Sequence, residues 1–306
     1  MVWLICLALI FTAPFVVEAL RPGMRRHPRS QAPGKFVKLP MGTTHYQWHG
    51  HTRGPVVVCV HGLTTPSFVW DGVVGGLTWL GFRVLTYDLY GRGYSARPSG
   101  AQNRAFFIQQ LDDLLESQGI EDDITLIGYS MGGAIATAYA HQHRNRLRRL
   151  ILIAPAGLGH DLGVLTRFAT KIPLLGDWLM LTFFPRKFRA GAEAERDLPT
   201  SVAGIVDQQI AQLQWRGYVP AVLSSLRGIL SEVQQADHEG LARTGIPVLA
   251  IWGELDETIP HSCMGTLAKW NRRAKHVSVP GAGHGLAYTH TKEVVEAIRA
   301  NIFDAA

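Results

Sequence analysis

From about Phe36 onward, short runs of β-forming residues alternate with stretches whose apolar residues have helical spacing. Several runs are apolar at consecutive positions, as in Val-Val-Val-Cys-Val-His-Gly. Strands of this kind are buried on both faces, so the alternation predicts an α/β fold with a mostly parallel sheet covered by helices on both sides. The first two runs have no helix between them and are expected to form an antiparallel beginning of the sheet. The β runs are 44–50, 56–62, 82–88, 124–130, 147–155, 247–253 and 275–280, and helices are expected over 68–80, 105–118, 131–143, 262–270 and 291–303.

The alternation stops between Gly157 and about Gly240, where helical spacing continues without a convincing core strand. A structureless loop of about eighty residues is uncommon in a compact protein. We therefore expect a helical cap inserted into one catalytic body, which a 306-residue chain with 47% hydrophobic residues can form. The predicted organisation is an apolar anchor or signal peptide at 1–20, a basic linker at 21–35, core at 36–157, cap at 158–240 and core at 241–306.

The sequence Gly-Tyr-Ser-Met-Gly-Gly, which begins at Gly128, lies where a predicted strand turns directly into a predicted helix. Gly128 and Gly132 suit a tight turn in which side chains would collide with the adjoining strand or helix. Ser130 is then held at the apex, beside a helix N-terminus, and is a candidate nucleophile. The Met131 N–H is a candidate donor to a developing oxyanion, and the Leu63 N–H, in the loop after the run at 56–62, is the expected second donor.

A serine hydroxyl is a weak nucleophile, so it needs a base and an acid that orients the base. Two later strands are expected to end in Gly-Glu-Leu-Asp-Glu and Gly-Ala-Gly-His-Gly, which offer Asp256 and His284. Both would lie at the carboxyl edge of the sheet, where Ser130 is also expected. Glu254 and Glu257 are the alternative acids.

At these positions the chain resembles the α/β-hydrolase superfamily, from about residue 40 to 303. The resemblance implies the fold of that family, a catalytic triad of Ser130, His284 and Asp256, and an oxyanion hole formed by Leu63 and Met131. It specifies the fold and the triad well and the substrate weakly. The segments that carry it, in the family's order, are HGLTTPSFVW, YDLYGRGYS, GYSMGG, WGELDETIP and GAGHG.

Other polar residues have structural interpretations. His61 is expected to hold the loop that carries the oxyanion donor, and Asp88 and Arg92 to shape the edge of the sheet. The segment Trp-Leu-Met-Leu-Thr-Phe-Phe is expected to be a buried cap helix rather than a membrane contact. The remaining histidines that we considered are expected on the surface or in the cap, and they are His45, His141, His143, His160 and His261.

The resemblance also limits the classes of reaction that we expect. Ser130 separates the chain from the haloalkane dehalogenase and epoxide hydrolase branches, which use a carboxylate nucleophile. An apolar cap beside an apolar N-terminus favours a carboxylesterase or monoacylglycerol-lipase-like enzyme acting on a small-molecule ester with a lipidic chain. The alternatives are a carbon–carbon bond hydrolase of aromatic ring-cleavage products and a ligand sensor without turnover. No CxxC or HExxH motif occurs, so no metal or other cofactor is predicted.

The positive charge is concentrated near the N-terminus. Six of the 30 basic residues lie in 21–40, which has no acid, and the remaining 24 balance the 24 acidic residues. A neutral body lacks the basic surface typical of nucleic-acid-binding proteins, so we expect no nucleic-acid partner. Basic residues beside an apolar run instead suit lipid headgroups.

Residues 2–20 have two interpretations. Val2–Val17 carries no charge and, as a helix with its flanks, is long enough to cross or nearly cross a bilayer. The arginines that follow favour an anchor with the catalytic body in the cytoplasm, and three cysteines that cannot pair completely favour a reducing compartment. Pro14 and Glu18 count against an anchor. A small-residue cleavage site at Val17-Glu18-Ala19 would instead give a secreted or periplasmic protein.

Overall fold

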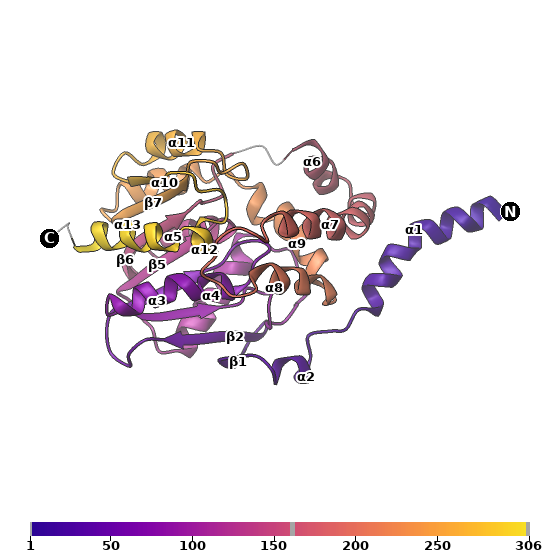
Figure 1. The fold of residues 1–306 in the computed structure, drawn as a ribbon, viewed down its shortest axis with the longest axis horizontal. Helices are drawn as coiled ribbons and strands as arrows, with labels where there is room; N and C mark the ends of the chain where they lie inside the picture. The colour runs from indigo at the N-terminus through magenta and orange to yellow at the C-terminus, as the bar shows by residue number, and fades with distance from the viewer. Residues whose placement is uncertain (1, 160–162, 304–306) are drawn as a thin grey trace.

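The chain folds around one sheet of eight strands in the order β1-β2-β4-β3-β5-β6-β7-β8 (Figure 1). The computed structural model describes residues 2–159 and 163–303, so His160 lies outside the described part. All neighbouring strands from β4 to β8 are parallel, whereas β2 is antiparallel to both β1 and β4. The strands are β1 (Lys35–Leu39), β2 (Gly42–His49), β3 (Val56–Val60), β4 (Arg83–Tyr87), β5 (Ile124–Tyr129), β6 (Leu147–Ile153), β7 (Val248–Gly253) and β8 (Lys275–Val279).

This sheet confirms the predicted fold class, with two differences at its antiparallel edge. Strand β1 was not among the predicted runs, because its sequence Lys-Phe-Val-Lys-Leu is short and two of its five residues are lysines. Strand β2 does run antiparallel to its neighbours, but it pairs with β4 rather than with β3, the next strand along the chain. Both edges of β3 are already occupied by β4 and β5.

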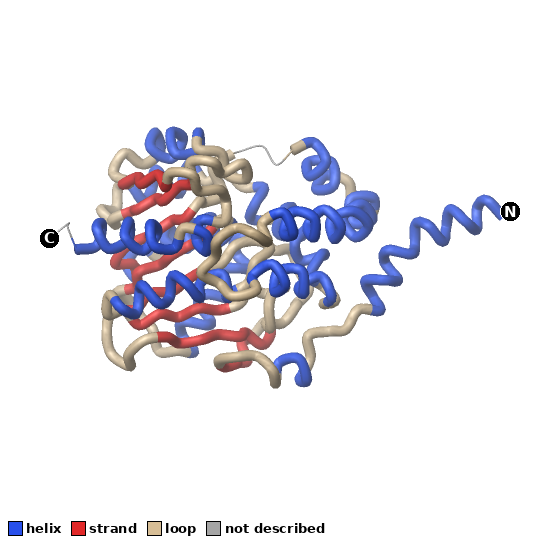
Figure 2. Tube along the Cα trace, viewed as in Figure 1, coloured by secondary structure: helices blue, strands red, loops and turns tan. Residues whose placement is uncertain are grey.

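Helices cover both faces of the sheet, as predicted (Figure 2). Successive side chains of a strand point to opposite faces. Val58 of β3 accordingly packs in the core that contains α4 and α5, whereas Val57 packs in the core that contains α3 and α13. The helices around the sheet are η1 (Ser67–Trp70), α3 (Asp71–Trp79), α4 (Arg104–Ser117), α5 (Met131–Gln142), η2 (Arg144–Arg146), α11 (Ser262–Trp270), α12 (Leu286–Thr289) and α13 (Thr291–Phe303).

The chain between β6 and β7 is helical. Most of its helices, which we call the inserted helices, lie beyond the carboxyl ends of the parallel strands (Figure 1). They share an apolar core of their own, which includes Met180, Tyr218 and Val222. The inserted helices are α6 (Val164–Lys171), α7 (Leu175–Ala194), α8 (Ile205–Ala211), η3 (Gln212–Gln214), α9 (Tyr218–Arg227) and η4 (Ile229–Ser231). The last helix of this segment, α10 (Gln235–Ala242), packs against α5 and α11 and so lies with the helices of the sheet.

The N-terminal helix α1 (Val2–Leu20) extends away from the body and is almost wholly exposed (Figure 1). It is the only described helix that is long and apolar enough to cross a membrane. Its second half nevertheless contacts α7, where the Phe11 ring stacks on Trp178 at 6.4 Å and the Trp178 Nε1 donates to the Ile10 carbonyl at 3.2 Å.

The end of α1 is joined to the inserted helices by polar contacts. The buried Glu18 accepts a hydrogen bond of 2.6 Å from the Gly217 N–H and pairs with Arg21 at 2.7 Å. The Arg216 side chain donates to the Ala19 carbonyl at 3.2 Å. The chain then passes through α2 (Arg26–Arg29) and enters β1. In the sequence, Glu18 counts against an anchor. In the structure this residue connects the end of α1 to the body.

Candidate active site

Ser130 is the single residue between β5 and α5, and its backbone has a conformation that residues other than glycine rarely adopt. Its φ is 54° and its ψ is −119°. Holding a non-glycine residue there costs about 1–3 kcal/mol, so the surrounding structure must fix it. The fixing contacts are backbone hydrogen bonds: the Ser130 N–H donates to the Ile153 carbonyl, and its own carbonyl accepts from Gly133 and Ala156 at 2.9 and 3.0 Å.

The glycines on either side of Ser130 allow this turn. A Cβ on Gly128 would lie 2.3 Å from the Gly132 carbonyl oxygen, and a Cβ on Gly132 would lie 2.0 Å from the Val60 carbonyl oxygen. Both contacts are with backbone, which cannot move aside. The strand, the helix and the neighbouring strand β3 therefore meet so closely that only glycine fits.

His284 and Asp256, from the loops after β8 and β7, are brought to Ser130. His284 Nε2 lies 3.0 Å from Ser130 Oγ, and its Nδ1 lies 2.8 Å from Asp256 Oδ2. The other carboxylate oxygen of Asp256 accepts the N–H groups of Thr258 and Ile259, both at 2.8 Å. Because the carboxylate accepts the Nδ1 proton, the neutral imidazole presents its Nε2 lone pair to the serine hydroxyl.

The alternative acids point elsewhere. Glu254 accepts the Gly281 N–H at 3.0 Å, and Glu257 is exposed on the surface. Asp256 by contrast is buried, with a side chain that is 1% exposed.

Tyr129, just before the serine, supports His284 and was not singled out from the sequence. Its hydroxyl donates to the His284 carbonyl at 2.8 Å, and the two rings stack with centroids 5.4 Å apart. The only sequence signal was an aromatic residue beside the candidate nucleophile.

The candidate oxyanion donors flank the serine. Met131 is the first residue of α5, and Leu63 lies in the loop after β3, next to Gly62. Gly62 and Leu63 line the same cavity as Ser130, and a Cβ on Gly62 would lie 3.3 Å from the Ser130 Cβ. The loop thus approaches the nucleophile about as closely as its backbone allows.

His61 holds this loop, in agreement with its predicted structural role. Its Nδ1 lies 2.8 Å from the Gly62 carbonyl, and its Nε2 accepts the Leu89 N–H at 2.9 Å. Complete burial lowers the pKa of His61 to about 4, although nearby Asp88 opposes this shift. A neutral imidazole with a proton on Nδ1 satisfies both contacts at pH 7.

Asp88 and His45 form a buried pair behind the loop. Asp88 lies 2.8 Å from His45 Nδ1 and also accepts the N–H groups of Ser67 and Tyr94, both at 2.9 Å. Burial opposes ionisation of Asp88, but His45, the nearby His61 and the Ser67 N–H hold its pKa below the usual value. His45 is 1% exposed, so its expected surface position is wrong. Nothing in the local sequence of His45 indicated a partner 43 residues away.

Arg92 is fully buried and bridges the core to the inserted helices. It is therefore more than a residue that shapes the sheet edge. Among the described residues it has no carboxylate partner. All of its acceptors are neutral, namely the carbonyl oxygens of Leu63 (3.1 Å), Tyr90 (3.0 Å) and Ala221 (3.2 Å), the hydroxyl of Ser225 (2.8 Å) and the side-chain oxygen of Gln102.

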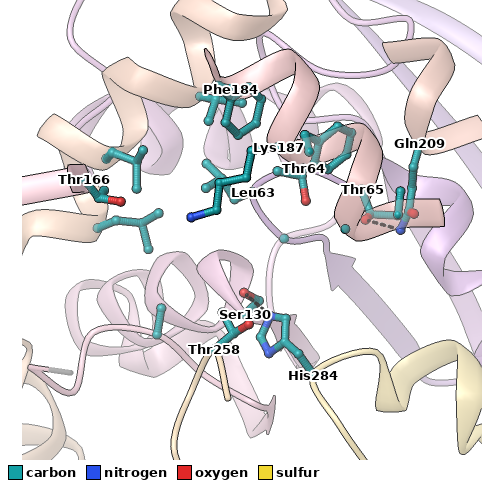
Figure 3. Close-up of a pocket in the computed structure, with 18 of the residues that line it drawn as sticks. Leu63, Thr64, Thr65, Ser130, Thr166, Phe184, Lys187, Gln209, Thr258 and His284 are labelled. Carbon is teal, nitrogen blue, oxygen red and sulfur yellow. Dashed lines mark hydrogen bonds between the residues drawn. The ribbon is translucent and has the colours of Figure 1, made fainter. Parts of the chain in front are cut away.

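A cavity of about 500 Å³ lies between the inserted helices and the Ser130–His284 pair (Figure 3). Its lining is mainly apolar, with large contributions from α7 and α9 that include Met180, Leu179, Phe183, Phe184, Phe188, Val222 and Leu226. Among the described residues, Lys187 and Glu195 are the Lys, Arg, Asp or Glu side chains outside the triad that line it. Glu195 accepts the Tyr288 hydroxyl at 2.7 Å, and burial with this contact raises the pKa of Tyr288.

The arrangement has the elements that nucleophilic acyl transfer requires. A hydroxyl is hydrogen-bonded to a base, the base to a carboxylate, and the hydroxyl faces a cavity with two backbone N–H groups nearby. Among the described residues, no group of three or more His, Cys, Asp or Glu side chains is placed to hold a metal ion.

Known proteins of the same fold resemble the chain over most of its length. A 2-hydroxymuconate semialdehyde hydrolase of Pseudomonas sp. (strain CF600) is 30% identical over 219 residues, covering 68% of this chain and 72% of that protein. A pimeloyl-[acyl-carrier protein] methyl ester esterase of Aeromonas hydrophila is 27% identical over 259 residues, covering 80% and 94%.

The fold is also that of a solved bacterial membrane phospholipase A, with a TM-score of 0.72. That structure is 17% identical and covers 98% of this chain and 94% of its own, a likeness that concerns the fold alone. Residues 55–291 match the family described as alpha/beta hydrolase fold. The resemblance found in the sequence is thereby confirmed, and the chain belongs to the α/β-hydrolase fold family.

Proposed function

We propose that the protein is a serine hydrolase that cleaves carboxylic esters through an acyl-enzyme. Ser130 Oγ attacks the ester carbonyl while His284 takes its proton, and Asp256 stabilises the resulting imidazolium. The Leu63 and Met131 N–H groups hold the oxyanion. His284 then protonates the leaving alcohol, and a water activated by the same histidine hydrolyses the acyl-enzyme. The observation that carries this proposal is the pair of contacts that His284 makes, 3.0 Å to Ser130 and 2.8 Å to Asp256.

The substrate class follows from the cavity. The inserted helices serve as a cap, and they place a mainly apolar wall over the serine. A cavity of about 500 Å³ has the size of a small-molecule site. We infer that it receives a small ester with an apolar acyl chain, as in a carboxylesterase or a monoacylglycerol lipase.

Membrane association through residues 2–20 is the second part of the proposal. The exposed, apolar α1 would cross the bilayer with the basic segment after it at the headgroups, and the catalytic body would lie in the cytoplasm. Exposed apolar side chains of α6, α7 and the turn between them, including Phe168, Leu174 and Phe183, would then lie near the same surface. The alternative is cleavage of residues 1–19 as a signal peptide, which gives a secreted or periplasmic enzyme.

A carbon–carbon bond hydrolase is the alternative reaction. The relative that is 30% identical carries the name 2-hydroxymuconate semialdehyde hydrolase, and the same serine and histidine could serve both chemistries. A ligand sensor without turnover is the alternative from another class, because such a protein could retain all three residues.

A hydrolysis screen distinguishes these functions. Purified full-length protein is assayed on p-nitrophenyl esters of increasing acyl length, on monoacylglycerols and on a ring-cleavage dienoate, beside the Ser130→Ala variant. Multiple turnover of the esters, with loss of both turnover and fluorophosphonate labelling in the variant, is expected. Turnover of the dienoate alone would favour carbon–carbon cleavage, and a single hydrolytic event would favour the sensor. Labelling that persists in Ser130→Ala would overturn the assignment of the nucleophile.

A further inference from the structure

Among the described residues, Lys187 is the only lysine or arginine that lines the cavity. It lies on α7, between the aromatic residues Phe184 and Phe188, and Figure 3 shows its amino group directed into the cavity toward the side on which Ser130 and His284 lie. The cavity wall around it is mainly apolar. A charged group therefore projects into a space that is otherwise suited to hydrocarbon.

No described group neutralises this charge. Among the described residues, Lys187 forms no ion pair or hydrogen bond, and the one acidic lining residue outside the triad, Glu195, accepts the Tyr288 hydroxyl instead. Lys187 and Glu195 are also eight positions apart in sequence, which places them about 12 Å apart along a helix axis. Lys187 and the neighbouring Arg186 are both exposed, but only Lys187 lines the cavity.

We propose that Lys187 binds an anionic group, a carboxylate or a phosphate, that the substrate carries away from its reacting ester. The substrate is then an anionic amphiphile, whose apolar chain packs on the cavity wall while its charge pairs with Lys187. The proposal rests on the ester hydrolysis proposed above and specifies which esters are preferred. Because Lys187 is exposed where the cavity opens, water and salt screen its charge, and the expected preference for an anionic ester is modest.

The test compares matched anionic and neutral esters. One pair is the p-nitrophenyl monoester of adipic acid and p-nitrophenyl hexanoate, in which the anion is a carboxylate on the acyl side. The other is an acylglycerol phosphate and the monoacylglycerol of the same chain, in which the anion is a phosphate on the alcohol side. The full-length protein, Lys187→Ala, Lys187→Glu and the control Arg186→Ala are assayed. Arg186 lies on the same helix and is exposed, so its variant removes an equal charge from outside the cavity.

We expect Lys187→Ala to lower kcat/KM on the anionic member of at least one pair about 2- to 5-fold, mainly through KM, and to leave the neutral member unchanged. Lys187→Glu should lower it further, and raising the salt concentration should reduce the preference in the wild-type protein. The pair that responds identifies carboxylate or phosphate as the ligand. Equal effects of Lys187→Ala and Arg186→Ala, or no loss in either pair, would overturn the proposal. Absence of all ester turnover would instead refute the proposed function, so the two failures are distinct.

Discussion

Asp256 contacts His284 with one carboxylate oxygen and closes its own loop with the other. Oδ2 lies 2.8 Å from His284 Nδ1, while Oδ1 accepts the N–H groups of Thr258 and Ile259. The carboxylate is therefore oriented before any substrate arrives, and so is the imidazole that depends on it.

Replacing Asp256 with Asn should lower kcat on a soluble ester by about 10⁴, because the imidazole loses its tautomeric preference and its charge partner. Steady-state kinetics measure this loss. Glu254→Gln is the matched control and should remain close to wild type, since Glu254 bonds to Gly281. An inactive Glu254→Gln beside an active Asp256→Asn would mean that the acid has been assigned wrongly.

The strained backbone of Ser130 predicts that glycine at this position gives a more stable fold than alanine. Ser130→Gly should unfold at higher temperature than Ser130→Ala, with about 1 kcal/mol more free energy of unfolding, because glycine adopts a φ of 54° without strain. Both variants lack the hydroxyl and should be inactive, so the comparison isolates the backbone. Equal melting temperatures would contradict the strain.

The low pKa values of two buried histidines predict that the folded protein becomes less stable in acid. Burial lowers the pKa of both His61 and His238 to about 4, from 6.5. Between these values the unfolded chain binds protons that the folded chain does not. The free energy of unfolding should therefore fall as the pH drops from 6.5 to 4, by up to about 3 kcal/mol for each histidine.

His238→Phe isolates one of these contributions. Neither ring nitrogen of His238 has a hydrogen-bond partner in the structure, and the ring stacks on Trp270. The variant should be folded at pH 7 and should lose less stability on acidification in denaturant titrations. Replacement of the exposed His51 by Gln is the control and should leave the pH dependence unchanged. An unaltered pH profile in His238→Phe would refute the assignment.

Arg92→Lys should destabilise the protein by at least about 2 kcal/mol and lower kcat, because a lysine cannot serve the acceptors that the guanidinium binds and the Leu63 carbonyl is among them. Ser225→Ala removes a single acceptor on α9 and should cost only about 1 kcal/mol. Urea denaturation and kcat at a temperature where both variants are folded measure the two effects. If kcat is unchanged in Arg92→Lys, Arg92 does not position the loop that carries Leu63.

Deleting residues 1–30 should release a soluble protein that keeps its activity on water-soluble esters and loses rate on esters embedded in vesicles. The deletion also removes Glu18 and Phe15 from a small cavity lined by Met180 and Val219, so some loss of stability is expected. N-terminal sequencing of the mature protein tests the premise. A chain that begins at Leu20 would remove the anchor from the proposal.

The order of strands and helices could be predicted because buried parallel strands and amphipathic helices leave separate periodicities in the sequence. The predicted helices over 262–270 and 291–303 agree with α11 and α13 at both ends. Strand order could not be predicted, because nothing local in β2 indicates that its partner is β4. Pairing across the sheet depends on the whole packed core.

The positions of Ser130, Asp256 and His284 could be predicted because each follows a strand, and the carboxyl ends of parallel strands share one edge. Contacts between remote segments could not. The burial of His45, the bridge from Arg92 to α9 and the direction of Lys187 depend on how the inserted helices and loops pack, which no short motif encodes.

The bridge made by Arg92 limits how the active site can open. Pulling α9 away from the core would strand a buried cation without its acceptors and would also break the 2.8 Å bond from the Tyr218 hydroxyl to the Thr64 carbonyl. The α9 side of the cavity is therefore expected to stay closed. A substrate would then have to enter from another side, and α7, against which α1 lies, offers the exposed apolar flank nearest to the proposed anchor.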